Sequence, residues 1–223
     1  MSEELADDYD AVIFDNDGVL VEPTEQDVIV DGVRRAFESF GVEIDRSVAR
    51  QTVEDSTVPT ETAREHGLDP EALWHYRELT VALAQQTHVR DGGKQVYDDI
   101  AALEHLAVPL GVVSNNQHAT IEFLLVHHEL EYFETAYGRQ PTLAGAANRK
   151  PEPYYIERAL ADLDASDALY VGDSETDVLA AHNAGLDSVF LRREHCADAT
   201  LSVEPTAEVH DLRSLVERLT EQH

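Results

Sequence analysis

Short apolar runs recur along this chain, and each ends in polar residues or glycine. The runs at residues 9–14, 108–113, 168–171 and 188–191 have the length and β-branched content of buried strands, and residues 134–137 predict a weaker strand. Helical spacing of apolar residues fills the intervals. It predicts helices at residues 95–106, 117–130, 153–163 and 176–184, and a closing short strand and helix over 208–219. This alternation predicts an α/β fold, in which a doubly wound, mostly parallel sheet forms a Rossmann-like three-layer core.

One long stretch interrupts the alternation. Residues 22–88 hold no strand candidate, and their apolar spacing predicts helices at residues 26–40, 46–53, 60–66 and 70–87. We therefore expect a core of residues 1–21 and 89–223, with an all-helical unit of residues 22–88 inserted after the first strand. Trp74 is expected in the hydrophobic core of that helical unit rather than at a ligand site.

The charge balance is extreme for a globular chain. Asp and Glu number 45 against 16 Lys and Arg, which gives a net charge of −29 spread along the whole sequence. Such a field disfavours nucleic acids and anionic membranes as partners. Lysine is nearly absent, since only Lys94 and Lys150 are present. An acidic, lysine-poor surface is typical of salt-loving archaea, where molar salt shortens the Debye length to about 3 Å. We therefore expect a halophilic source and instability at low salt.

Other features of the composition indicate a soluble, cytoplasmic protein. The single cysteine, Cys196, excludes an intramolecular disulfide and is expected to be a small, partly buried residue. Residues 1–10 lack the apolar segment of a signal peptide, and no apolar run approaches 18 residues. The oligomeric state, monomer or dimer, is left open.

Polar side chains capable of chemistry follow three of the predicted strands. Asp15 and Asp17 come directly after the first strand, on one side of an extended backbone. The other strand-end residues are Ser114 and Asn115 after the second strand, and Asp173 and Asp177 after the third clear strand. A parallel sheet brings these ends to one edge. Carboxylates without thiols or clustered histidines suit a hard divalent cation, Mg²⁺ first.

The lysines sharpen this interpretation. Although lysine is rare in this chain, Lys150 stands in the loop before a helix. A compact ammonium suits a tight phosphate site better than a guanidinium does. We therefore expect Lys150 to be functional. Lys94 has no comparable motif around it and is expected on the surface. The eleven histidines show no ligand spacing and are expected on the surface as well. A calcium-binding EF-hand loop beginning at Asp15 is excluded, because Val19, Leu20 and Gln26 stand where it needs a ligand, a glycine and a glutamate.

Four sequence segments together resemble a known family. FDNDGVL, VVSNN, KPEP and GDSETD occur in this order, each after a predicted strand or before a helix, and they resemble the four motifs of the haloacid dehalogenase-like superfamily. The helical insert resembles that superfamily's type 1 cap, as in its phosphoglycolate phosphatase and β-phosphoglucomutase branch. The resemblance covers residues 9–195.

The resemblance implies roles for the acidic residues. Asp15 resembles the nucleophile that forms an aspartyl-phosphate, and Asp17 resembles the general acid and base. Asp173 would bind Mg²⁺ together with Asp15 and the backbone carbonyl of Asp17. Asp177 would orient this metal site, directly or through water.

The remaining motif residues are implied to bind phosphate. Ser114, with the backbone of Asn115, would hold the phosphoryl oxygens. Lys150 would neutralise the charge of the phosphate and of the nucleophile. Because phosphoryl transfer depends mainly on positioning and electrostatics, this set of residues suits it.

The resemblance implies a Mg²⁺-dependent phosphatase acting on a small phosphorylated metabolite. Halide removal needs neither Asp17 nor Mg²⁺, so the presence of Asp17 favours phosphoryl transfer. Many phosphatases of this branch have threonine where this chain has Val19, and a sugar phosphomutase is the main alternative. A non-catalytic interaction protein on the same scaffold is the second.

Substrate choice is expected to lie in the cap. The polar segment 51–60 is the candidate specificity loop. Arg50 and Arg64 have two interpretations, namely bidentate contacts to a substrate carboxylate or ordinary solvated positions on helices. Phosphoglycolate and sugar phosphates are the substrate types that this kind of cap suggests.

Overall fold

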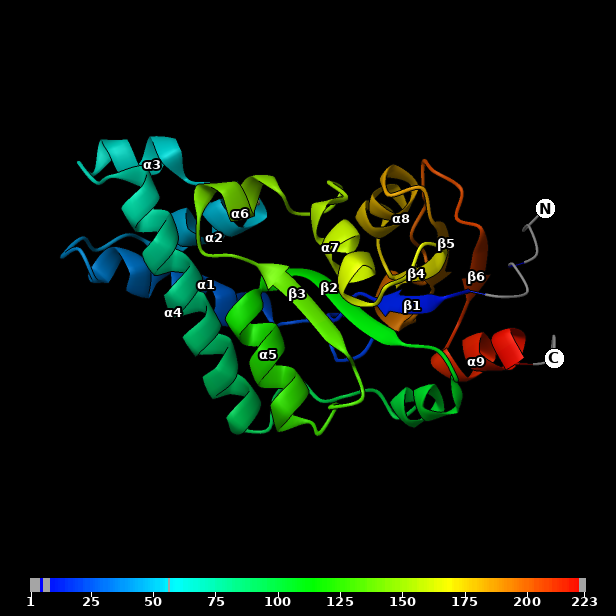
Figure 1. Cartoon of the computed structure of the whole chain (residues 1–223). Coiled ribbons are helices and arrows are strands. Elements are labelled where there is room, and N and C mark those ends of the chain that lie inside the picture. The colour runs from blue at the N-terminus through cyan, green and yellow to red at the C-terminus, as the bar shows by residue number, and fades with distance from the viewer. Residues whose placement is uncertain (1–4, 6–8, 56, 221–223) are drawn as a thin grey trace.

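A computed structural model describes residues 5, 9–55 and 57–220 of the chain. Six parallel strands form one sheet in the order β3-β2-β1-β4-β5-β6 (Figure 1). The strands are β1 Ala11–Phe14, β2 Leu110–Gln117, β3 Thr135–Arg139, β4 Ala168–Gly172, β5 Asp187–Leu191 and β6 Ala207–Val209. The expected α/β fold is thereby confirmed. Most of segment 1–10, for which no signal peptide is expected, and Ser56 of the candidate specificity loop lie outside the described residues.

Two helical layers cover the sheet, because alternate strand residues face opposite sides. In β1, Ala11 and Ile13 pack with α7 and α8, whereas Val12 and Phe14 pack with α5 and α9. The core helices are α5 His118–His127, α6 Leu143–Ala147, α7 Tyr154–Asp162, α8 Glu175–Asn183 and α9 Leu212–Thr220. β1 is buried on both faces and lies between β2 and β4, so the chain that leaves it emerges at the centre of the sheet edge.

Four helices form the cap inserted after β1. They are α1 Gln26–Glu38, α2 Arg46–Glu54, α3 Thr60–Glu65 and α4 Pro70–Arg90. Their own core gathers apolar residues such as Val33, Phe37 and Leu73. The long helices α1 and α4 approach closely at Gly32, where a Cβ atom would lie 2.7 Å from the Cα of Val81. Glycine is therefore required at this crossing.

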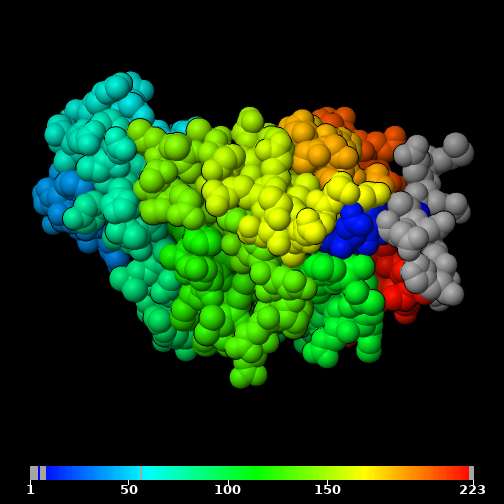
Figure 2. Space-filling model, in the orientation of Figure 1, coloured from blue at the N-terminus to red at the C-terminus, as the bar shows by residue number. Residues whose placement is uncertain are grey.

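The cap and the core are in direct contact (Figures 1 and 2). Trp74 of α4 donates a hydrogen bond of 3.1 Å to the carbonyl of Thr142, which also caps α6. His75 contacts the carbonyl of Pro141 at 3.1 Å. The residues before α6 therefore hold α4 of the cap against the end of the sheet.

Three local predictions are wrong. Residues 95–106 are not one helix, because Gln95 and Tyr97 bond to the backbone of residues 20–22 and only Ile100–His105 forms a 3₁₀ helix. The second strand does not stop at residue 113, because Gln117 still pairs with Arg139 of β3 after a register shift. The predicted loop before Lys150 contains α6. No helix among the described residues is both long and apolar enough to cross a lipid bilayer.

Candidate active site

Asp15 follows β1 without a break in the sheet. Its backbone N–H donates a 2.8 Å hydrogen bond to the carbonyl of Val171, so the carboxylate stands at the carboxyl end of β1 beside β4. Gly18 has a φ of +82°, and a Cβ atom there would overlap the carboxylate of Asp173. The glycine thus lets the chain turn toward the cap while passing close to the second acidic strand end.

Lys150 lies at the centre of the site. Its Nζ atom is 2.9 Å from Oδ1 of Asp15 and 2.5 Å from Oδ1 of Asp177, and it donates to the hydroxyl of Tyr170 at 2.8 Å. Burial opposes the charge of Lys150, but Asp15 and Asp177 outweigh it and raise its pKa. Lys150 therefore stays protonated in a position 3% exposed to solvent.

Asp177 has two structural tasks, one for each oxygen. Its Oδ1 atom accepts from Lys150, and its Oδ2 atom accepts from the backbone N–H of Ser174 at 3.0 Å. The Ser174 side chain in turn accepts from the backbone of Asp177, which completes a capping box at the start of α8. The helix start therefore fixes the carboxylate that positions Lys150.

Three carboxylates, those of Asp15, Asp173 and Asp177, place oxygen atoms within 4.8 Å of one another. Burial raises the pKa of Asp15 to about 7 against the opposing charge of Lys150. Burial, followed by the charge of Asp177, also raises the pKa of Asp173 to about 7. Within the described part of the chain, the buried Oδ1 of Asp15 accepts no hydrogen bond of good geometry, although Lys150 is close. An all-oxygen donor set with excess negative charge fits a hard divalent cation such as Mg²⁺.

Asp17 is held by a separate ion pair with Lys94. Lys94 donates to Oδ1 of Asp17 and, at 2.5 Å, to the hydroxyl of Thr24. Asn116 donates to the other oxygen of Asp17 at 2.8 Å. The prediction that Lys94 lies on the surface is wrong, because Lys94 is only 4% exposed. The rarity of lysine, which indicates a functional role for Lys150, holds equally for Lys94.

Ser114 and Asn115 lie in the last part of β2. Ser114 is buried, and its hydroxyl accepts from the backbone N–H of Asn116 at 3.3 Å. The side chain of Asn115 makes two hydrogen bonds to the backbone of Lys150, of 2.8 and 3.0 Å. Asn115 therefore anchors the loop that carries Lys150, a task that its position in the sequence did not predict.

One exposed histidine contacts the acidic cluster. Nε2 of His195 lies 2.6 Å from Oδ2 of Asp173, although the residue is exposed. Cys196 beside it is partly buried, as expected. His195 follows β5 by a few residues, and no ligand spacing in the sequence indicated its contact with the acidic cluster.

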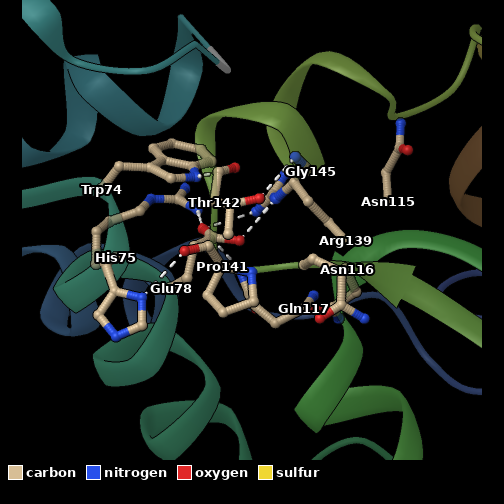
Figure 3. Close-up of polar contacts among 12 residues, drawn as sticks. Trp74, His75, Glu78, Asn115, Asn116, Gln117, Arg139, Pro141, Thr142 and Gly145 are labelled. Carbon is tan, nitrogen blue, oxygen red and sulfur yellow. Dashed lines mark hydrogen bonds and ion pairs between the residues drawn. The ribbon is translucent and has the colours of Figure 1, made fainter. Parts of the chain in front are cut away.

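A cavity of about 330 Å³ opens beside Asp17, between the cap and the ends of β2 and β3. Cap residues Trp74, Arg77 and Gln85 line it together with Arg139 and Arg149 of the core. Figure 3 shows Trp74 and Glu78 pointing toward Arg139 and Thr142, with Asn115 apart from this cluster. The sequence did not single out these arginines as functional.

Other predictions about the cap have mixed outcomes. Trp74 is buried as expected, but it lies at the boundary with the core and not in the hydrophobic core of the cap. Arg50 pairs with Asp27 at 2.6 Å, and Arg64 is exposed; neither is among the cavity-lining residues. Within segment 51–60, residues up to Glu54 belong to α2, and Val53 lines the cavity.

Comparison with known proteins gives one consistent picture. The family model described as haloacid dehalogenase-like hydrolase matches residues 12–191. A phosphoglycolate phosphatase of Rhodobacter capsulatus is 27% identical over 214 residues, which cover 92% of this chain and 94% of that protein. The pyrophosphatase PpaX of Anoxybacillus flavithermus is 27% identical over 196 residues, which cover 83% of this chain and 87% of that protein.

Solved structures share the fold. The structure of CbbY from Rhodobacter sphaeroides in complex with phosphate has a TM-score of 0.68 at 19% identity, and the match covers 93% of this chain and 96% of that one. A mutant of the same protein in complex with xylulose-1,5-bisphosphate matches equally well. These similarities give no support to a halophilic source, which remains a prediction from composition. The match over residues 12–191 and the sheet with its inserted cap show that the chain belongs to the haloacid dehalogenase-like hydrolase family, in its phosphoglycolate phosphatase-like branch with a helical cap.

Proposed function

We propose that this hydrolase is a Mg²⁺-dependent phosphatase that cleaves a small phosphorylated metabolite through an aspartyl-phosphate on Asp15. One observation carries the proposal. The carboxylate of Asp15 lies 2.9 Å from the buried ammonium of Lys150, in a cluster with two further carboxylates. This arrangement offers a nucleophile and a fixed positive charge at one point, which suits transfer of a dianionic phosphoryl group.

The reaction divides into two displacements. In the first, an oxygen of Asp15 forms a bond to phosphorus while the bond to the leaving oxygen breaks, and Asp17 gives that oxygen a proton. In the second, Asp17 removes a proton from water as the water attacks phosphorus, which releases phosphate and restores Asp15. One group thus serves first as acid and then as base.

The other residues position the phosphoryl group. Lys150 balances the charge of Asp15 and of the phosphoryl oxygens. The Ser114 hydroxyl, near the carboxyl end of β2, would donate to a phosphoryl oxygen. Asp15 and Asp173 would hold Mg²⁺ with the backbone carbonyl of Asp17, and Asp177 would fix their arrangement. The cation, when bound, supplies positive charge that lowers the repulsion between the carboxylates and the incoming phosphate.

Similarity to relatives supports a small substrate. Two of the relatives are described as a phosphoglycolate phosphatase and a pyrophosphatase. The cavity beside Asp17 lies at the small end of the usual range for ligand pockets, about 300–1,000 Å³, with its volume of about 330 Å³. We therefore propose a substrate of the phosphoglycolate or sugar phosphate type.

A phosphate-release screen tests the proposal. The purified chain would be assayed with Mg²⁺, in low and in molar KCl, against p-nitrophenyl phosphate, phosphoglycolate, pyrophosphate and several sugar phosphates. Release of phosphate that stops on chelation is the expected result. Conversion of β-glucose 1-phosphate only with a bisphosphate activator would instead favour the phosphomutase. No turnover of any substrate in either salt would favour the interaction protein and refute the proposal.

A further inference from the structure

The cavity beside Asp17 is strongly basic, on a chain that is strongly acidic. Its lining contains three guanidinium groups, those of Arg77, Arg139 and Arg149, and the carboxylate of Asp17. Asp17 is already paired with Lys94. Arg139 ends β3, whereas Asp17 follows β1, and β2 lies between these two strands. Positive charge is therefore in excess on the β3 side of the cavity, away from this pair.

One glutamate partly compensates the arginines. Glu78 is fully buried and accepts hydrogen bonds of 2.7 and 3.0 Å from Nε and Nη2 of Arg139, and another from Nη1 of Arg77. A guanidinium carries five N–H groups, so these three bonds leave further donors on both arginines. Glu78 therefore fixes the two side chains and leaves them a net positive charge.

An aromatic ring orients the same two groups. The guanidinium carbons of Arg77 and Arg139 lie 4.9 and 5.2 Å from the centre of the Trp74 ring. Trp74 is itself held by its hydrogen bond to Thr142 (Figure 3). A planar, preorganised guanidinium loses little conformational freedom when it binds a carboxylate or phosphate in bidentate fashion.

The third guanidinium adds further positive charge. Arg149 is half-buried, and within the described part of the chain no carboxylate forms an ion pair with it. Burial lowers the pKa of Arg77 against the opposing charge of Glu78, and the charges of Arg139 and Arg149 act in the same direction as burial. Three guanidiniums around one carboxylate are a costly arrangement unless an anion joins them.

We propose that the leaving group of the substrate carries a second anionic group, a carboxylate or a phosphate, which Arg77, Arg139 and Arg149 bind at the end of the cavity remote from Asp17. The inference rests on the proposed phosphatase function and adds a class of substrate to it. Asp17 would protonate the leaving oxygen at one end while the arginines hold the second anion at the other. Since Arg77 belongs to the cap and the other two to the core, such a substrate also draws the cap onto the core.

A matched pair of substrates tests the inference without any variant. Phosphoglycolate and 2-hydroxyethyl phosphate differ chiefly in a carboxylate against a neutral hydroxymethyl group. 2-Hydroxyethyl phosphate is the reference substrate. If the second anion is a carboxylate, we expect kcat/KM to be at least about 100-fold higher for phosphoglycolate than for this reference. If it is a phosphate, we expect the same ratio for an organic bisphosphate or pyrophosphate. The substrate that gives the larger ratio identifies the anion.

Arg149→Gln then tests the residue. This variant removes a guanidinium that forms no hydrogen bond with Glu78, so the variant should fold. Arg77→Gln is a second variant, and its melting temperature is compared with that of the parent protein before its kinetics are measured. Each should lower kcat/KM for the preferred anionic substrate by about 10-fold or more relative to 2-hydroxyethyl phosphate. Arg64→Gln, which replaces an exposed cap arginine outside the cavity, is the matched control and should leave both values unchanged.

The outcomes separate the inference from the function beneath it. Equal kcat/KM values for all these substrates, or equal losses on all of them in both variants, would overturn the second anion site and leave the phosphatase standing. Absence of turnover on every phosphomonoester with Mg²⁺ would overturn the proposed function itself.

Discussion

The ion pair between Lys94 and Asp17 should contribute measurably to stability. The side chain of Lys94 is 1% exposed and that of Asp17 is 23% exposed. Removing one partner of a fully buried ion pair costs about 3–5 kcal/mol, whereas exposed pairs contribute about 0–1 kcal/mol. Because Asp17 keeps some contact with water, we expect an intermediate coupling free energy of about 2 kcal/mol at pH 7.

A double-mutant cycle measures this coupling directly. Lys94→Met, Asp17→Asn and the double variant would be unfolded in urea, each without Mg²⁺, and the free energies of unfolding compared. Both substitutions keep roughly the size of the original side chain. Residue 94 has a left-handed backbone with φ 56°, and Lys94→Met meets the same backbone constraint in the single and the double variant. Backbone effects therefore cancel in the cycle.

The pKa of Asp17 determines how the coupling free energy changes with pH. Burial opposes the charge of Asp17, but Lys94 outweighs it, and hydrogen bonds from Lys94 and Asn116 help to lower the pKa of Asp17 below its usual value near 3.8. A lowered carboxylate pKa stabilises the fold above the unfolded value and loses that contribution as the pH falls through the folded pKa. The coupling should therefore be full at pH 7 and shrink below pH 4. A value under about 0.5 kcal/mol at pH 7, or one that does not change with pH, would refute this account of the pair.

Three further results are expected. Asp15→Asn should abolish turnover, as followed by phosphate release, and activity like that of the parent protein would remove Asp15 as nucleophile. Because burial and then Asp177 raise the pKa of Asp173 to about 7, its stabilising contribution is present below the unfolded pKa and lost as the pH rises through about 7. Without metal, Asp173→Asn should thus be more stable than the parent by up to about 4 kcal/mol at pH 8 and similar to it near pH 4, with Mg²⁺ reversing the order at pH 8 in calorimetry. The net charge of −29 predicts a melting temperature that rises between low and molar KCl, and an unchanged melt would count against salt adaptation.

The sequence predicted the centre of the sheet well because its central strands are buried on both faces. β1 and β4 are continuous apolar runs, and each ends at the residue where the chemistry begins. The carboxyl ends of β1 and β4 bring Asp15, Asp173 and Asp177 together, since a parallel sheet leaves few alternatives, and the loop before α7 adds Lys150. Their catalytic roles stay predictions that the proposed assays would test.

Segments whose conformation depends on a distant partner were predicted poorly. Residues 95–97 have helical propensity, but the two connections between cap and core pair with each other there, as at the bridge between Val21 and Val96. The end of β2 is extended because Gln117 pairs with Arg139 across a register shift. Neither partner is marked in the local sequence, and tertiary hydrogen bonds override the local preference.

The distribution of cations shows why the arginine cluster and Lys94 were missed. Of 16 lysines and arginines in the chain, five surround the site: both lysines, Arg77, Arg139 and Arg149. On so acidic a surface an exposed cation needs no particular partner, because water solvates it. A buried cation, by contrast, needs an anion from the chain or from a ligand. Lys150 and Lys94 have theirs in Asp15 and Asp17, and Glu78 serves two arginines at once. Arg149 lines the cavity and forms no ion pair among the residues that the structure describes, so we expect the substrate to supply the anion there.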